Sequence, residues 1–224
     1  MSSSKDVQLV EFTSSRKIKS LYGFFETYGE ERLAGLSESH FSGLSEDERE
    51  EALNFLKDGF NVSSERITGL YTLDKVRAVN LFKVEVGAPI VSSSFPAEQQ
   101  ALEGNRLLML RYICSVDPDE KYVDDICKFA TSQFPKIRAE FAQSLPARQL
   151  GRSVVDALKG MIFTETERIP LTSAITKFMA IHGMDYDMND PLYKSIYLLL
   201  RSENPKEKFF AMRQLEKRQP SGQV

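Results

Sequence analysis

The stretch that decides the fold is "SSERITGLYTLDKVRAVNLFK", residues 63–83. Apolar residues recur in it at intervals of three and four, which places them along one face of an α-helix. This stripe consists of Ile67, Leu70, Tyr71, Ala78, Leu81 and Phe82. A second apolar set on a neighbouring face consists of Leu73, Val76 and Val79. We therefore predict one helix across residues 64–86 that is buried on more than one side.

Broad apolar surfaces recur further along the chain, in "RLLMLRYICSV" at residues 106–116 and in "LYKSIYLLL" at residues 192–200. In an α-solenoid, every interior helix packs against its hairpin mate and against the next repeat, so such helices are buried on several sides. A central helix of a compact bundle would show the same pattern. The recurrence favours a stack of helical hairpins.

Proline and Asx residues mark the expected helix starts, because proline suits the first helical turn and a preceding Asp or Asn can cap it. The motifs are "SFPAEQQ", "VDPDEKY", "QFPKIRAE", "SLPARQL", "NDPLYKS" and "ENPKEKF". Asp117, Asp190 and Asn204 are the predicted caps, and "SEDE" at residues 45–48 has capping-box spacing. The predicted helices span residues 16–34, 45–59, 64–86, 96–115, 118–132, 135–144, 147–162, 171–182, 191–202 and 205–218.

No pair of segments predicts a sheet. The β-prone stretches "VQLVEF" at residues 7–12 and "FKVEVGAPIVSSSF" at residues 82–95 have no convincing pairing partner. We predict a single all-α domain over residues 1–224, built of about ten helices, with a flexible N-terminal arm at 1–15 and a flexible tail at 219–224.

Two segments carry a family resemblance: "FPKIRAEFAQSL" at residues 134–145 and "NPKEKFFAMRQLEKR" at residues 204–218. Each has a turn with proline, a basic residue, and then Ala and Leu at helical spacing. The chain resembles HEAT-like and armadillo-like repeat proteins across residues 45–218. Pair starts at 45, 96, 135 and 171 are 51, 39 and 36 residues apart, an imperfect repeat whose spacings bracket the period of about 40–47 residues. Consecutive Asp-x-x-Val-Arg signatures are lacking. The resemblance implies an α-α superhelix of stacked hairpins.

Composition narrows the possible functions. The chain has 29 basic and 32 acidic residues, a net charge of −3, which disfavours a dedicated nucleic-acid binder because such proteins neutralise phosphates with Lys and Arg. No run approaches the roughly 18 apolar residues of a membrane span, and the N-terminus lacks a signal-peptide core. We expect a cytoplasmic protein. Cys114 and Cys127 lie among apolar neighbours and are predicted to be buried free thiols.

Asp74 falls on the apolar stripe of the first stretch, where an ionised carboxylate is costly unless it is paired. One hypothesis makes it a catalytic or partner-contacting acid. The favoured interpretation is an ion pair with Arg77 or Lys75, or with Arg106 or Arg111 of the next hairpin.

Two acidic segments are candidate partner-binding sites. "MDYDMNDP" at residues 184–191 begins like a calcium loop, but Asp190 and Ile196 stand where that loop needs Gly and Glu. We predict an exposed acidic turn that ends in the Asp190 cap. With the acidic start of "SEDEREE" at residues 45–51, the candidate partner-binding residues are Asp185, Tyr186, Asp187, Glu46, Asp47 and Glu50. In contrast, residues 206–219 are mostly basic. This basic segment is either a polar cap at the end of the repeat stack or a binding patch.

No catalytic, metal or cofactor motif is found. His40 and His182 lack partners at metal-ligand spacing, and no Ser or Cys lies in a nucleophile motif. We expect a non-enzymatic protein-binding module without a cofactor. Small acidic HEAT-like chains resemble bacterial immunity proteins, which implies inhibition of a cognate toxin by direct binding. The alternatives are a HEAT-like DNA alkylation-repair protein, which requires a basic concave face, and a regulatory adaptor.

Overall fold

A computed structural model describes residues 16–27, 35–117, 119–146 and 151–218. These residues form eleven α-helices and three short 3₁₀-helices, and none of them lies in a strand. The predicted all-α fold of about ten helices is therefore confirmed. No helix among the described residues is long and apolar enough to cross a membrane. The predicted flexible arm and tail lie outside the described residues.

The helices follow the chain order α1 to α12. Their bounds are α1 Arg16–Glu26, α3 Glu46–Lys57, α4 Ser64–Leu73, α5 Lys75–Gly87, α6 Pro96–Val116, α7 Glu120–Cys127, α8 Pro135–Ser144, α9 Arg152–Thr164, α10 Arg168–Ile181, α11 Pro191–Arg201 and α12 Pro205–Glu216. The 3₁₀-helices are η1 Glu38–His40, η2 Phe60–Val62 and η3 Lys128–Thr131.

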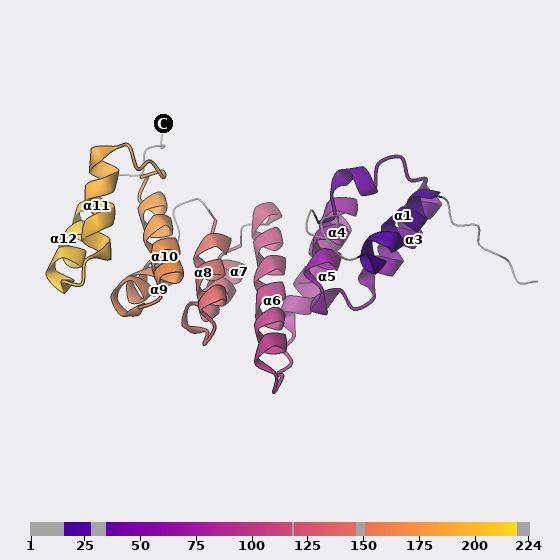
Figure 1. The fold of residues 1–224 in the computed structure, drawn as a ribbon, viewed down its shortest axis with the longest axis horizontal. Coiled ribbons are helices and arrows are strands. Elements are labelled where there is room, and N and C mark those ends of the chain that lie inside the picture. Colours follow the sequence, from indigo (N-terminus) through magenta and orange to yellow (C-terminus); the bar gives the residue numbers. More distant parts are fainter. Residues whose placement is uncertain (1–15, 28–34, 118, 147–150, 219–224) are drawn as a thin grey trace, which may run out of the picture.

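The helices are arranged along the longest axis of the molecule, from α1 and α3 at one end to α11 and α12 at the other (Figure 1). In one row, α4, α6, α8 and α10 contact one another in succession. The helices α5, α7 and α9 pack against this row, and α11 and α12 close the C-terminal end as a pair. Each interior helix therefore has neighbours on several sides, which explains the broad apolar surfaces in the sequence.

The stretch at residues 63–83 is two helices, so the prediction of one continuous helix is wrong. Asp74 has extended backbone (φ −149°, ψ 95°) between α4 and α5. Its N–H donates to the Leu70 carbonyl at 3.0 Å, and its carboxylate accepts the Arg77 N–H at 3.0 Å. The change of direction buries Leu73 but leaves Val76 69% exposed, contrary to the predicted second buried stripe.

Asp74 is also paired as the favoured interpretation predicted. Its Oδ2 lies 3.4 Å from Nε of Arg77, and its side chain is 34% exposed. The carboxylate therefore sits at a helix N-terminus on the surface and is not enclosed by apolar side chains, which removes the desolvation cost inferred from the helical wheel.

Most predicted helix starts are confirmed. Pro96, Pro135, Pro191 and Pro205 open α6, α8, α11 and α12. Asp190 and Asn204 cap the last two as predicted. Ser45 and Glu48 form the predicted capping box: the Ser45 N–H donates to Glu48 Oε2 at 2.7 Å, and the Glu48 N–H donates to Ser45 Oγ at 3.3 Å.

Other boundaries differ from the prediction. Asp117 ends α6 instead of capping α7, and Asp119 takes the cap position, accepting the Lys121 N–H at 2.9 Å. The segment predicted as one helix at 118–132 is α7 followed by η3.

Three further helix boundaries differ from the predicted ones. Helix α1 ends at Glu26, α9 begins at Arg152, and α10 begins at Arg168, with Pro170 inside its first turn. Residues 28–34 and 147–150, which belonged to predicted helices, lie outside the described residues.

Cationic side chains join neighbouring helices by capping carbonyl groups near helix C-termini, where the helix dipole favours positive charge. Lys177 donates to the Leu145 carbonyl at 2.8 Å, and Lys208 donates to the Ile162 carbonyl at 2.5 Å. Arg106 binds the end of α5 through two carbonyls, those of Glu85 at 2.7 Å and Ala88 at 2.9 Å. Because these bonds join one helix to the next, they hold neighbouring helices together as well as capping the helix ends.

Candidate binding surface

The row formed by α4, α6, α8 and α10 is hollowed on both sides of α8. The α6–α8 hollow has a volume of about 470 Å³, and Ser64 of α4 closes one side of it. The α8–α10 hollow has a volume of about 870 Å³ and extends to Tyr197 of α11. Lys136, Glu140 and Gln143 of α8 line both hollows and form a ridge between them. We call the two hollows together the groove.

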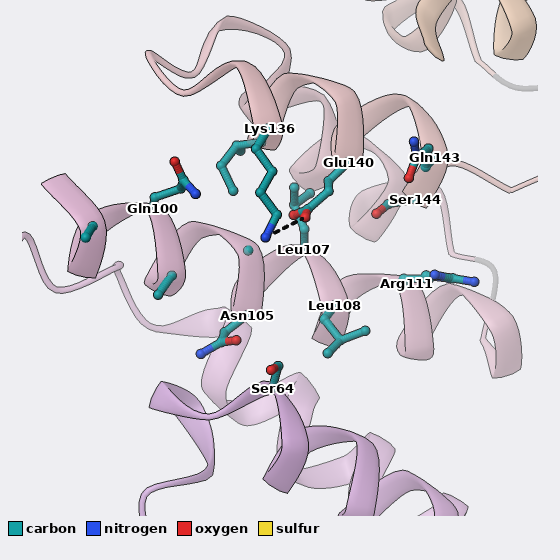
Figure 2. A pocket seen from close by; sticks show the side chains of 14 residues that line it. Ser64, Gln100, Asn105, Leu107, Leu108, Arg111, Lys136, Glu140, Gln143 and Ser144 are labelled. Atoms are coloured by element: carbon teal, nitrogen blue, oxygen red, sulfur yellow. Dashed lines mark ion pairs between the residues drawn. The ribbon is translucent and has the colours of Figure 1, made fainter. Parts of the chain in front are cut away.

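Figure 2 shows the α6–α8 hollow from close by. Gln100 and Asn105 of α6 lie on one side, and Lys136 and Glu140 reach in from α8 on the other. The Lys136 ammonium lies 3.7 Å from Glu140 Oε1, one helical turn further on. This pair is partly exposed and contributes at most about 0.5 kcal/mol. Its main effect is to present one cation and one anion side by side to a ligand.

Small residues on α6 keep this hollow open. Ala97, Ala101 and Gly104 line it at intervals of four and three, so they share one face of the helix. A Cβ on Gly104 would lie 3.4 Å from Glu140 Oε2 and 3.5 Å from Ile137 Cδ1. A larger side chain at any of these positions would fill the hollow from its floor.

The α8–α10 hollow has an apolar rim. Ile169 at the start of α10 is 69% exposed, and Pro135 and Pro170 lie beside it in the lining. Further along α10, the hydroxyl of Thr172 lies 3.3 Å from that of Tyr197 on α11. An exposed β-branched apolar residue beside neutral hydroxyl groups is typical of a surface that binds another protein.

The charges around the groove are mixed in sign. Its lining includes the cations Arg111, Lys136 and Arg168 and the anions Glu140 and Glu167. Nearby, burial lowers the pKa of Lys177, and the positive charge of Arg111 lowers it further. The groove therefore lacks the single-sign lining of a surface that binds a nucleic-acid backbone.

The histidines and cysteines take structural positions. The Nδ1 atom of His182 lies 2.7 Å from the Phe178 carbonyl at the end of α10, before Gly183 with φ 76°. His40 Nδ1 lies 3.1 Å from Ser37 Oγ. Both cysteines are free thiols, and Cys114 is buried as predicted, whereas Cys127 is only partly buried; burial raises the pKa of Cys127 to about 11. Among the described residues, no three His, Cys, Asp or Glu side chains are grouped to hold a metal ion.

The structure does not bring the predicted partner-binding residues together. Glu46, Asp47 and Glu50 lie at the start of α3, whereas Asp185, Tyr186 and Asp187 lie in the turn between α10 and α11, at the other end of the stack (Figure 1). None of the six lines the groove.

The turn itself has the predicted form. Asp187 accepts the Asn189 N–H at 2.8 Å, and Asp190 accepts the Leu192 N–H at 2.9 Å. The Tyr186 side chain is 68% exposed, with its ring centroid 5.6 Å from that of Tyr193. At the other end, Glu50 binds Arg77.

The sequence did not predict the groove, because the groove is formed by three helices, α6, α8 and α10, that are distant in sequence. The spacing of Ala97, Ala101 and Gly104 was the one signal of a flat, open helix face. No family model, curated protein or solved structure matches this chain.

Proposed function

We propose that this chain is a protein-binding module whose partner lies along the groove. The observation that carries the proposal is the pair of adjoining hollows, about 470 and 870 Å³, on one row of helices. Hollows of this combined size accept several side chains of a partner, and the α8 ridge between them divides the contact into two pockets. Such a surface suits a helix or a loop of another protein.

The lining supports a protein partner in preference to a nucleic acid. An apolar rim at Ile169 lies within reach of paired charges at Lys136 and Glu140 and of neutral groups such as Gln143. Protein interfaces bring apolar side chains and polar groups together in one contact. Duplex DNA would instead require an excess of cations along the groove.

The narrower proposal is that the partner is a bacterial toxin and that the chain is its immunity protein. It rests on the resemblance of small acidic HEAT-like chains to that class. Acidic groups at either end of the stack, at Glu46 and Asp187, would steer a basic toxin toward the surface before it seats in the groove. Co-expression with the product of the neighbouring gene tests this: growth is rescued if the neighbour is a toxin and this chain its inhibitor. A harmless neighbour that forms no complex removes the immunity proposal.

The groove itself is tested by capture from the native organism and by titration with the captured protein. Ala101→Glu on α6 and Ile169→Glu on α10 each introduce a charge at an exposed position of one hollow. We expect either change to raise the dissociation constant at least about tenfold. Val116→Glu is the matched control, since Val116 is an exposed apolar residue outside both hollows. Unchanged binding by both groove variants would contradict the proposed surface.

A further inference from the structure

The C-terminal helix pair exposes two adjacent phenylalanines. Phe209 and Phe210 of α12 are each 57% exposed. The Phe209 ring packs against Phe163 of α9, with 4.7 Å between ring centroids. This contact holds the Phe209 side chain in position. Exposed aromatic rings of this size are costly to leave in water and are enriched at the centres of interfaces.

Cations surround these rings. Lys206, Phe210, Arg213 and Lys217 follow one another at helical spacing on the exposed side of α12, opposite the buried Met212. Over residues 191–218 there are seven basic and three acidic residues, a net charge of +4. The chain as a whole is negative, so the α11–α12 pair has the opposite sign to the chain, although the acidic turn at Asp185, Asp187 and Asp190 directly precedes it.

At the other end, an apolar hollow of about 450 Å³ lies between α3 and α5; we call it the α3–α5 hollow. Its apolar lining consists of Leu53, Phe60, Leu81 and Val84. Val84 is 77% exposed, and Val76, two helical turns earlier on α5, is 69% exposed. Val76 and Val84 are thus apolar side chains of α5 that the fold leaves largely exposed.

The surroundings of this hollow are acidic. Residues 45–58 contain six acidic and two basic residues, a net charge of −4. Two cations, Lys57 and Arg77, line the hollow, but Arg77 is paired with both Glu50 and Asp74. The N-terminal end therefore offers an apolar recess with an excess of negative charge beside it.

We propose that Phe209 and Phe210 of one copy seat in the α3–α5 hollow of a second copy, so that the chain assembles head to tail. The α11–α12 pair and the segment beside the α3–α5 hollow both expose apolar side chains and are opposite in charge, which supports a second copy as the occupant. Pairing of two phenylalanine surfaces with each other would instead bring two sets of cations together. A head-to-tail contact leaves one free end on each side and permits growth beyond a dimer. Both surfaces lie outside the groove, so this inference stands apart from the proposed function.

Sedimentation of the full-length protein over a range of concentrations is the first test. We expect the average mass to rise above the 25.4 kDa of one chain as concentration increases, and to fall again when salt is raised, because salt screens the opposite charges. A monomer at every concentration up to the millimolar range at low salt would overturn the proposal.

The decisive test uses two variants that each block one end. Phe210→Glu removes the inserted ring, and Val84→Glu places a charge in the recess; both positions are exposed, so folding is spared. Each variant alone should associate at least about tenfold more weakly than the wild type. Mixed together, they should form a one-to-one dimer and nothing larger, since one intact contact remains between them.

Two outcomes of the mixing experiment contradict the proposal. If Val84→Glu alone still dimerises like the wild type, the phenylalanine surface pairs with something other than the α3–α5 hollow. If the mixture forms no dimer, the two surfaces are not partners. Ile169→Glu is the control, an exposed apolar residue of the groove whose change should leave self-association intact even where it weakens binding of a captured partner.

Discussion

Arg138 of α8 and Glu165 in the turn between α9 and α10 form a two-pronged ion pair. Arg138 Nε lies 2.6 Å from Glu165 Oε2, and Nη2 lies 3.0 Å from Oε1. The Glu165 side chain is only 4% exposed, and it also accepts the N–H groups of Thr166 and Glu167. The pair therefore ties α8 to the segment that leads into α10, and these two helices line the α8–α10 hollow.

Replacing Glu165 with Gln should lower the free energy of unfolding by about 2 kcal/mol, because the partly buried guanidinium of Arg138 loses its counter-charge. Chemical denaturation measures this change. Glu167→Gln is the matched control, since Glu167 is an exposed residue two positions further along the same turn, and its change should alter stability by less than about 0.5 kcal/mol. Equal effects of the two substitutions would show that the ion pair does not hold the turn.

The same pair predicts a pH dependence. The hydrogen bond from Arg138 holds the pKa of Glu165 below its ordinary value, against the opposing effect of burial. A depressed carboxyl pKa adds stability above the unfolded-state value and loses it as pH falls through the folded-state value. The stability difference between wild type and Glu165→Gln should therefore be constant above about pH 5.5 and shrink as pH falls further. A difference that stays constant down to pH 3 would contradict this assignment.

Asp74 is expected to stabilise the junction of α4 and α5 as a helix cap. Asp74→Ala removes the acceptor of the Arg77 N–H and should cost about 1 kcal/mol, whereas Asp74→Asn keeps an acceptor and should cost less. Thermal or chemical unfolding measures both. If Ala and Asn are equally tolerated, capping is not the role of this side chain.

Asp74 also shows why part of the fold was predictable and part was not. Helix starts with proline, Asn or a capping box, such as those at Pro135 and Ser45, were predicted to within a residue because the signal is local. At Asp74 the spacing of apolar residues continues unbroken across the break between α4 and α5. Periodicity cannot detect such a break when the residues on both sides remain buried, as Leu73 and Val79 do.

The candidate binding surface was less predictable than the fold. The acidic turn around Asp187 and the acidic start of α3 near Glu46 are exposed segments that sequence identifies directly. The groove instead depends on the packing of α8 between α6 and α10, which places Gln100 opposite Lys136 across a hollow. Residues brought together only by packing give no local signal.

Two glycines in helices should respond in opposite ways to substitution by alanine. A Cβ on Gly69 would lie 2.7 Å from Leu36 Cδ1 and 3.1 Å from Leu56 Cδ2, and both leucines are buried. Overpacking there should outweigh the gain in helix propensity and lower stability by roughly 1–2 kcal/mol.

Gly160 of α9 is the matched control for this effect, since nothing lies within 4 Å of the position of its Cβ. Gly160→Ala should therefore raise stability by about 0.5–1 kcal/mol through helix propensity alone. The unfolding midpoints of the two variants, compared with that of the wild type, show whether each substitution stabilises or destabilises the protein. Stabilisation by Gly69→Ala would mean that α3 and α4 are packed less closely than the structure shows.

Cys127 should be chemically quiet in the folded protein. Burial, with a smaller contribution from the charge of Asp124, raises its pKa to about 11. Since the thiolate is the reactive form, alkylation at pH 8 should be about 100-fold slower than for the unfolded chain, whose thiol has an ordinary pKa. A Cys114→Ser variant isolates Cys127 for this measurement, and the rate in denaturant is the reference. Alkylation at equal rates with and without denaturant would place Cys127 in solvent and would contradict the packing of α7 against α9.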